Sequence, residues 1–232
     1  MARSPQRTPV PGPAFIRLLA SLTEGDIPAS SPALSDRLSE WFDWTRAVTL
    51  SRALDGRLPS APEDAPRFDS AEQAECARVR AALVENISQA PASSAHAANT
   101  AAAGFAPFGQ RYLQQQRAMQ AATGRLRGRL RDMLALESEA LARLAEVDAV
   151  MEQTLSPREH SLLARIPALL EGHFERLRAN ACGPSPDTDA SDAAAAGPWL
   201  DTFRRDLQGL LLAELDVRFH PIEGLLAALR PR

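Results

Sequence analysis

The chain has 232 residues, with 26 Lys plus Arg against 29 Asp plus Glu and a formal net charge of −3. All 26 basic residues are arginines, and 43 alanines and 31 leucines stand against 7 valines, 5 isoleucines and 1 tyrosine. This composition favours helix and argues against a β-sandwich, a β-barrel or a large parallel sheet. The balanced charge argues against a protein that coats nucleic acid, and the absence of lysine excludes a P-loop or a Schiff-base mechanism.

Three features of the sequence indicate in which cellular compartment the protein is located. No stretch is apolar over the 18 or more residues that a membrane-spanning helix needs, so we expect no transmembrane segment. Arg17 interrupts the apolar run near the N-terminus, which argues against a secretory signal. The two cysteines, Cys76 and Cys182, lie outside any CxxC or Cys/His cluster, as expected in a reducing compartment. We therefore expect a cytoplasmic protein.

The first part of the chain predicts a disordered tail followed by an N-terminal helical block. Residues 1–13 contain four prolines and no periodic pattern, which is typical of a disordered tail. Apolar residues three and four positions apart then predict three helices in a block over residues 14–89. These helices span residues 14–24, 31–54 and 69–89. The last of them opens with a capping box, Asp69 to Glu72.

The second predicted helix carries two of the three tryptophans. It opens with the N-cap serine Ser31 and the first-turn proline Pro32. Trp41 and Trp44 lie within one turn of each other, and we expect them to pack in the core. The alternative is an exposed aromatic anchor for a partner.

Two segments of low complexity divide the rest of the chain. Residues 90–106 and 181–197 are rich in small residues and lack apolar periodicity, so they are predicted to be flexible linkers. They separate a central helical block over residues 107–180 from a C-terminal block over residues 198–232. The C-terminal block is the most hydrophobic, and we expect it to pack on the rest so that the blocks form one domain.

Apolar residues recur every seven positions through much of the central block. This stripe comprises Tyr112, Met119, Leu126, Met133, Ala140 and Val147. The companion stripe, four positions further on, is apolar at only three of its six positions, whereas a two-stranded coiled coil needs both. We therefore expect packing inside a bundle, with a coiled coil to another chain as the alternative. Ser138 can cap a second helix, so the region is either one long helix or a helical hairpin.

Seven residues of the central block are the candidate partner-binding residues. They form an apolar seam, Leu126, Leu130 and Met133, with Arg125, Arg127, Arg129 and Arg131 around it. On a helical wheel Arg125 and Arg129 lie on one flank of the seam, and Arg127 and Arg131 lie on the other. Because the arginines flank the seam, we expect them to pair with acidic residues of neighbouring helices. Docking of a partner and binding of nucleic acid are the alternatives.

Charge changes sign along this block. Residues 109–136 carry a net charge of +5, and residues 137–159 carry −4. A continuous helix over the stripe would extend about 52 Å, so we expect part of it to pair antiparallel with another chain, basic half against acidic half. In the competing interpretation, the helix breaks near Ser138 and folds back on itself.

Three prolines predict where the remaining helices begin or bend. Ser156 and Pro157 predict the start of a new helix, and Pro167 should kink it. In the C-terminal block, Pro221 predicts a kink or a restart. The block itself is expected to begin at residue 198.

We find no sequence pattern typical of a catalytic or metal site. His160 and His173 are 13 residues apart and point in different directions on a helix, and no HExxH, ExxH or His-x₃-His spacing occurs. There is also no glycine-rich phosphate loop and no G-x-S-x-G. We therefore expect no catalytic residues, no metal ligands, no cofactor and no enzymatic activity.

Several stretches resemble a proteobacterial family of uncharacterised proteins of similar length. They are the runs from Leu144 to Leu170, from Phe174 to Leu177, from Trp199 to Gln208, from Leu212 to Leu215 and from Pro221 to Leu229. The resemblance follows a whole-length pattern and implies neither an activity nor binding residues. It favours an adaptor with a peripheral association at the inner face of the cell envelope.

Together these observations predict an all-α protein, a bundle of about six to eight helices with a long amphipathic middle helix or helical hairpin. We expect a non-enzymatic interaction or scaffold subunit of a bacterial protein complex, which binds a protein partner or a second copy through the helical seam. The alternative is a helical regulator that binds nucleic acid or an anionic surface through the arginine-rich segment, although nucleic acid is the less expected partner.

Overall fold

The computed structural model describes residues 13–23, 40–56, 68–89, 104–181 and 192–230, with side chains in the last range from residue 198 on. Every regular element in these ranges is a helix. The helices are α1 (Ala14–Thr23), α3 (Trp44–Asp55), α4 (Ser70–Ser88), α6 (Ala106–Glu137), α7 (Glu139–Leu163), α8 (Ile166–Ala181) and α9 (Asp192–Leu229). The predicted all-α bundle is therefore confirmed.

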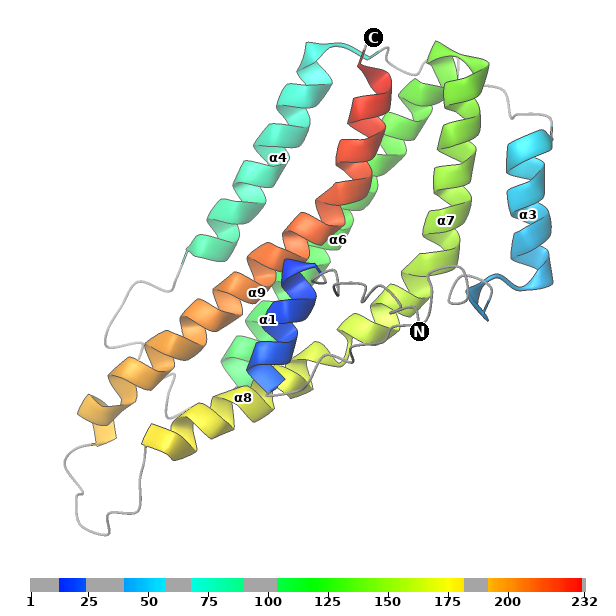
Figure 1. The fold of residues 1–232 in the computed structure, drawn as a ribbon. Helices are drawn as coiled ribbons and strands as arrows, with labels where there is room; N and C mark the ends of the chain where they lie inside the picture. The colour runs from blue at the N-terminus through cyan, green and yellow to red at the C-terminus, as the bar shows by residue number, and fades with distance from the viewer. Residues whose placement is uncertain (1–12, 24–39, 57–67, 90–103, 182–191, 231–232) are drawn as a thin grey trace, which may run out of the picture.

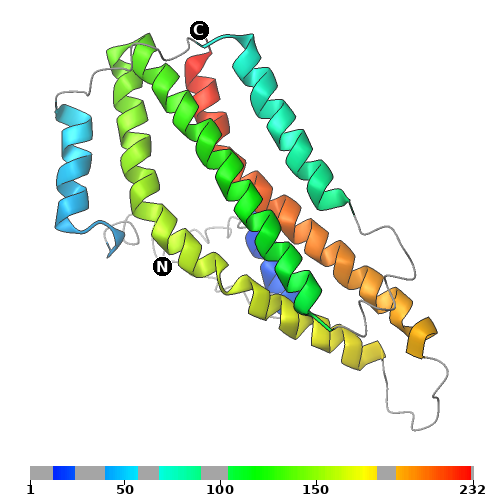
Figure 2. The ribbon, with the colours of Figure 1, turned by 180° about the vertical axis from the view of Figure 1, so that it is seen from behind.

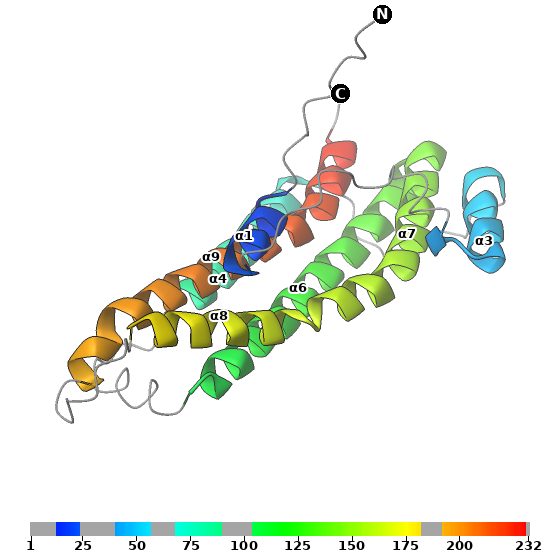
Figure 3. The ribbon, with the colours of Figure 1, turned by 60° about the horizontal axis from the view of Figure 1, so that its bottom comes forward.

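Two long helices, α6 and α9, form the centre of the bundle (Figure 1). α4 packs on both of them, and α7 packs along α6 on the other side (Figure 2). α8 packs on α9 and α6 at one end, where α1 lies against α8 and α9. α3 packs on the side of α7 that faces away from α6 and α9 (Figure 3). The bundle therefore has a well-covered centre and one outlying helix.

The core is built on α9, because this helix has a long apolar face. Its fully buried side chains include Leu200, Phe203, Leu210, Leu211, Leu215 and Ile222. At its N-terminal end, Phe203 and Trp199 pack edge-to-face on Phe174 of α8, each with its ring centroid 5.1 Å from that of Phe174. The predicted apolar face of the C-terminal block is therefore confirmed, and it anchors helices from all three predicted blocks in one hydrophobic core.

The central block is a helical hairpin. α6 ends at Glu137, and Ser138 takes an extended conformation with its hydroxyl oxygen accepting a hydrogen bond from the N–H of Leu141. A serine in this position caps the next helix, so α7 begins at Glu139 and runs back along α6. The seven-residue stripe is accordingly buried only in α6, since Ala140 is exposed and Val147 only partly buried.

The predicted helix over residues 31–54 is interrupted. Its first part lies outside the described residues, and the described part breaks at Phe42 and Asp43 before α3 begins at Trp44. The Asp43 carboxylate accepts a hydrogen bond from the N–H of Arg46 at 2.8 Å. This cap satisfies the first turn of α3 and competes with continuation of the preceding helix, which explains the break.

The predicted helix start at Ser156 is wrong. α7 passes through Pro157 and ends only at Leu163. The proline removes one backbone donor, and the helix bends over its C-terminal half (Figure 2). The true break precedes α8, so that Pro167 is the second residue of that helix, where a missing N–H leaves no hydrogen bond unmade.

The C-terminal block also begins earlier than predicted. α9 begins at Asp192 and continues through Pro198 and Pro221 without a restart. Residues on both sides of Pro221 are buried, Phe219 at 2% and Ile222 at 0% exposed, so packing outweighs the lost hydrogen bond. The predicted tail up to residue 12 and most of both predicted linkers lie outside the described residues. The second linker, predicted over residues 181–197, is wrong at both ends, because Ala181 belongs to α8 and residues 192–197 belong to α9.

Candidate functional site

The predicted partner-binding seam lies inside the bundle. Leu126, Leu130 and Met133 are 6%, 1% and 0% exposed and belong to the hydrophobic core. α6 carries them, and it packs against α9 and α7. A partner cannot reach these side chains unless the bundle opens, so the seam completes the core of this chain instead of offering a surface.

On one flank of the seam the arginines pair with the acidic half of the hairpin. Arg127 donates from Nε and Nη2 to the two carboxylate oxygens of Asp148 at 2.8 and 2.7 Å. Arg131 Nη2 lies 2.6 Å from Glu152 Oε2. Burial alone would lower the pKa of Arg127, but the hydrogen bonds and charge of Asp148, with Glu152, raise it. The antiparallel match of basic and acidic halves is therefore made within this chain.

On the other flank, within the described ranges, one arginine forms an ion pair and the other does not. Arg129 Nη2 lies 3.2 Å from Glu72 Oε1, which joins α6 to the first turn of α4. Arg125 is exposed and has no ion pair among the described residues. Three of the four candidate arginines thus hold helices together, and only Arg125 is available to an outside group.

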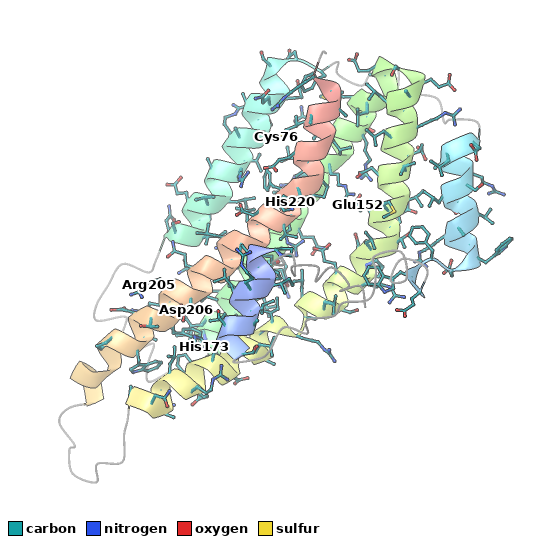
Figure 4. All side chains as sticks on the ribbon, viewed as in Figure 1. Cys76, Glu152, His173, Arg205, Asp206 and His220 are labelled. Atoms are coloured by element: carbon teal, nitrogen blue, oxygen red, sulfur yellow. The ribbon has the colours of Figure 1, made fainter. Side chains whose placement is uncertain are left out.

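A cleft of about 410 Å³ opens between α6, α7 and α9. The side chains along α6 are mostly polar, whereas α7 and α9 contribute both polar and apolar ones. The lining comprises Gln116, Gln120, Thr123, Gly124, Arg127, Glu152, Leu155, Ser156, Glu159, His160, Leu163, Val217, Arg218 and Pro221. Figure 4 shows Glu152 on the side of α7 that faces α6 and α9. This cleft is the candidate functional site.

A buried polar network adjoins the cleft and shares Gln116 and Arg218 with its lining. Glu214, only 2% exposed, accepts a hydrogen bond from the Tyr112 hydroxyl at 2.6 Å and lies 3.4 Å from Gln116 Nε2. Arg218 donates from Nε and Nη2 to Glu214 Oε1 at 3.0 and 2.8 Å, and its Nη1 lies 3.0 Å from Glu159 Oε1. Burial, together with the charge and hydrogen bond of Glu214, raises the pKa of Tyr112 far above its ordinary value.

The remaining chemistry-bearing residues are scattered. His173 Nε2 lies 2.9 Å from Asp206 Oδ2 and joins α8 to α9 (Figure 4). Cys76 is buried in α4, and this burial together with the charge of Glu75 raises the pKa of its thiol. Within the described ranges no three His, Cys, Asp or Glu residues come together as a metal site. None of the described helices is long and apolar enough to cross a membrane.

α3 and the neighbouring α7 present a second feature, three exposed apolar side chains. Trp44 is 83% exposed and Leu54 is 51% exposed, and Leu144 on the neighbouring α7 is 39% exposed. The predicted core packing of Trp44 is therefore wrong, because Asp43 starts a new helix and turns the indole outward. Trp41 instead lies under Arg158, whose guanidinium carbon is 5.5 Å from the centroid of the indole ring, a distance typical of a cation–π contact. We call Trp44, Leu54 and Leu144 the α3 surface.

The buried network was missed by the sequence reasoning. Glu214 is a single acid within an otherwise apolar run of α9, and Arg218 follows it four residues later. An isolated acid on an apolar helical face, with an arginine at i+4, is the signal that could have found it. Its partner Tyr112 could not be identified, because the register of α6 against α9 is a tertiary property.

A family model described as "Protein of unknown function (DUF3348)" matches residues 1–231. Comparison with curated proteins and with solved structures found no match. The family match covers all the helices described above and includes every residue that lines the cleft and the α3 surface. The chain therefore belongs to the DUF3348 family, a domain family of uncharacterised function.

Proposed function

We propose that this protein is a non-enzymatic interaction subunit of a protein complex and that it binds a partner protein through the α3 surface. The observation that carries the proposal is the 83% exposure of Trp44. Tryptophan is a large side chain that dominates the energetics of many protein interfaces when a partner buries it.

The packing of α3 supports this proposal. α3 has 12 residues, and an isolated helix of that length is marginal in water. Ala53 is its only buried residue, and its main packing partner is α7. A partner that covers Trp44 and Leu54 would supply the apolar contacts that the helix lacks.

The arginine-rich segment lends no such support to nucleic-acid binding. Arg127 and Arg131 are engaged with Asp148 and Glu152, so their charge is already compensated inside the hairpin. A cytoplasmic location remains part of our proposal and rests on the isolated cysteines and on Arg17 in the N-terminal apolar run. A peripheral association with the inner face of the envelope rests on the family resemblance.

The experiment is a quantitative affinity capture from the native host, comparing the wild type with Trp44→Ala. Loss of an interface hot spot that contributes about 2 kcal/mol weakens binding about 30-fold. We therefore expect Trp44→Ala to recover much less of the partner protein than the wild type does. Val84→Ala is the matched control, because Val84 is an exposed apolar residue on α4, away from α3. Equal recovery of every partner by wild type and Trp44→Ala would contradict the proposal.

Sedimentation of the purified protein then separates the two kinds of partner. If the α3 surface binds a second copy, the wild type will dimerise and Trp44→Ala will be monomeric. If it binds a different protein, both will be monomeric. Trp44→Ala should retain the wild-type melting temperature, because an 83% exposed side chain contributes little to the core.

A further inference from the structure

The cleft between α6, α7 and α9 has the size of a small-molecule site. Its volume of about 410 Å³ falls within the range of about 300–1,000 Å³ that is usual for ligand pockets. Gly124 widens it, because a Cβ atom built at this position meets no other atom within 4 Å. The space exists because α7 is tied to α6 at Asp148 and bends away from it further along the helix (Figure 2).

The two arginines of the cleft are held in the same way. Arg218 uses Nε and Nη2 to bind the buried Glu214, and Arg127 uses Nε and Nη2 to bind Asp148. In each case the remaining nitrogen, Nη1, lies near a carboxylate that lines the cleft. The guanidinium groups are therefore fixed from behind and each directs one donor nitrogen toward the cleft lining.

The two Nη1 atoms are less firmly engaged than the rest of each guanidinium group. Glu159 Oε1 lies 3.0 Å from Arg218 Nη1, and the Glu159 side chain is 48% exposed, against 9% for Arg218. Glu152 Oε1 lies 3.5 Å from Arg127 Nη1, which is longer than a good hydrogen bond. A ligand carboxylate can therefore bind the two Nη1 atoms by displacing the exposed Glu159 from Arg218. Glu152 keeps its ion pair with Arg131 through Oε2, 2.6 Å away, and the arginines stay in place.

Glu152 and Glu159 would then offer carboxylate oxygens to the ligand together with a third acceptor. Pro221 has no N–H, so the carbonyl of Val217 loses its i+4 donor, and both residues line the cleft. Glu152, Glu159 and this carbonyl together provide acceptors for the three N–H donors of an ammonium group.

The balance of charge selects the ligand class. Two arginines and two glutamates line the cleft, so a simple anion or a simple cation would leave one pair uncompensated. We propose that the cleft binds a small zwitterion of the amino-acid class, with its carboxylate at Arg127 and Arg218 and its ammonium at Glu152 and Glu159.

Three further groups can distinguish one such zwitterion from another. Gln120, Ser156 and His160 line the cleft, and their side chains make no hydrogen bond to other described residues. Leu155 and Leu163 add apolar surface from α7. The side chain of the ligand would meet this mixed wall.

The test is a thermal-shift assay of the purified chain with each of the common free L-amino acids at millimolar concentration. We expect at least one of them to raise the melting temperature, by about 3 °C at ten times its dissociation constant. The assay needs no protein partner, so its outcome is independent of the function proposed for the α3 surface.

Two derivatives of the amino acid that gives the largest shift test the charge requirement. The carboxamide lacks the negative charge and the N-acetyl form lacks the positive charge, and we expect each to lose the shift. A full shift with either derivative, or no shift with any amino acid, would overturn the proposal.

Gly124→Leu tests the location. Its side chain would enter open space in the cleft, so the variant should fold with the wild-type circular dichroism spectrum and lose the shift. Gly128→Leu is the matched control, because Gly128 lies one turn away on α6, has equally open space and does not line the cleft. A shift that persists in Gly124→Leu would place binding elsewhere.

Discussion

At the scale of single residues, the buried network around Glu214 is the most demanding feature of the molecule. An ionised carboxylate that is 2% exposed is tolerated only when every oxygen is hydrogen-bonded. Tyr112 and Arg218 meet this requirement from two different helices, and no described buried side-chain polar atom is left without a partner. The network therefore fixes the register of α6 against α9, which leucines alone would define less sharply.

Tyr112 allows a direct test of this network, because it is the only tyrosine of the chain. Its pKa is raised above the ordinary value of 10.0 by burial and by Glu214. The unfolded chain therefore loses this proton near pH 10.0 while the folded chain keeps it, so stability is complete below pH 10.0 and falls as the pH rises further. The free energy of unfolding then falls by about 1.4 kcal/mol for each pH unit.

Two measurements check this prediction. The tyrosinate absorbance of the folded protein should stay absent above pH 10.0 and appear only on unfolding. In urea unfolding at about pH 8 and about pH 11, Tyr112→Phe should lose less stability than the wild type over this interval. The raised pKa of Cys76 also lowers the free energy of unfolding as the pH rises, but it does so equally in the wild type and in Tyr112→Phe. The difference between the two proteins therefore reports on Tyr112 alone. Ordinary titration of the tyrosine in the folded chain would contradict the network.

At the scale of elements, the α6–α7 hairpin shows why the central block folds as it does. The sequence carries both halves of the pairing, basic in α6 and acidic in α7, and Ser138 supplies the cap that starts the return. Arg127 and Asp148 have side chains only 18% and 14% exposed, so their bidentate pair is partly shielded from solvent. The pair thereby contributes more than a surface salt bridge normally does.

The hairpin predicts different effects for neighbouring arginines. Arg127→Met should destabilise the protein by about 2 kcal/mol, because it leaves Asp148 partly buried without its main partner. Arg125→Met should change stability by less than about 0.5 kcal/mol, because Arg125 is exposed. Urea unfolding followed by tryptophan fluorescence measures both, and similar losses for the two variants would show that the pairing does not stabilise the hairpin.

Local signals in the sequence predicted several elements well. The capping box at Asp69 and Glu72 lies where the residue types placed it, and Ser138 decides between the two predicted alternatives in favour of the hairpin. Both features depend on hydrogen bonds within one turn. Pro157 and Pro221 were misleading, because packing of the helix can outweigh one lost backbone bond. The cleft could not be predicted at all, since it depends on how α7 diverges from α6 and on which side of α9 it faces.

At the scale of the whole molecule, the composition is explained by the bundle. Alanine-rich helices such as α4 bury little area each, and the leucines and phenylalanines of α9 compensate by reaching α1, α6 and α8 at once. Among the described residues, this arrangement joins the buried side chains of six helices in one hydrophobic core. In our proposal the outlying α3 binds the partner protein, and the cleft between α6, α7 and α9 binds the small ligand.

If the seam on α6 belongs to the core of this chain, a charge placed in it should unfold the protein. Leu130 is 1% exposed, and Leu130→Asp would bury a charge without a partner in the core. The cost, about 5 kcal/mol or more, is comparable with the total stability of a typical domain. We therefore expect the variant to lose its helical circular dichroism signal at every protein concentration. Leu162→Asp, at a leucine that is 62% exposed on α7, should remain folded and serves as the control. If the seam instead joined two chains, Leu130→Asp would yield a folded monomer from a wild-type oligomer in sedimentation velocity, and the bundle would not be self-sufficient.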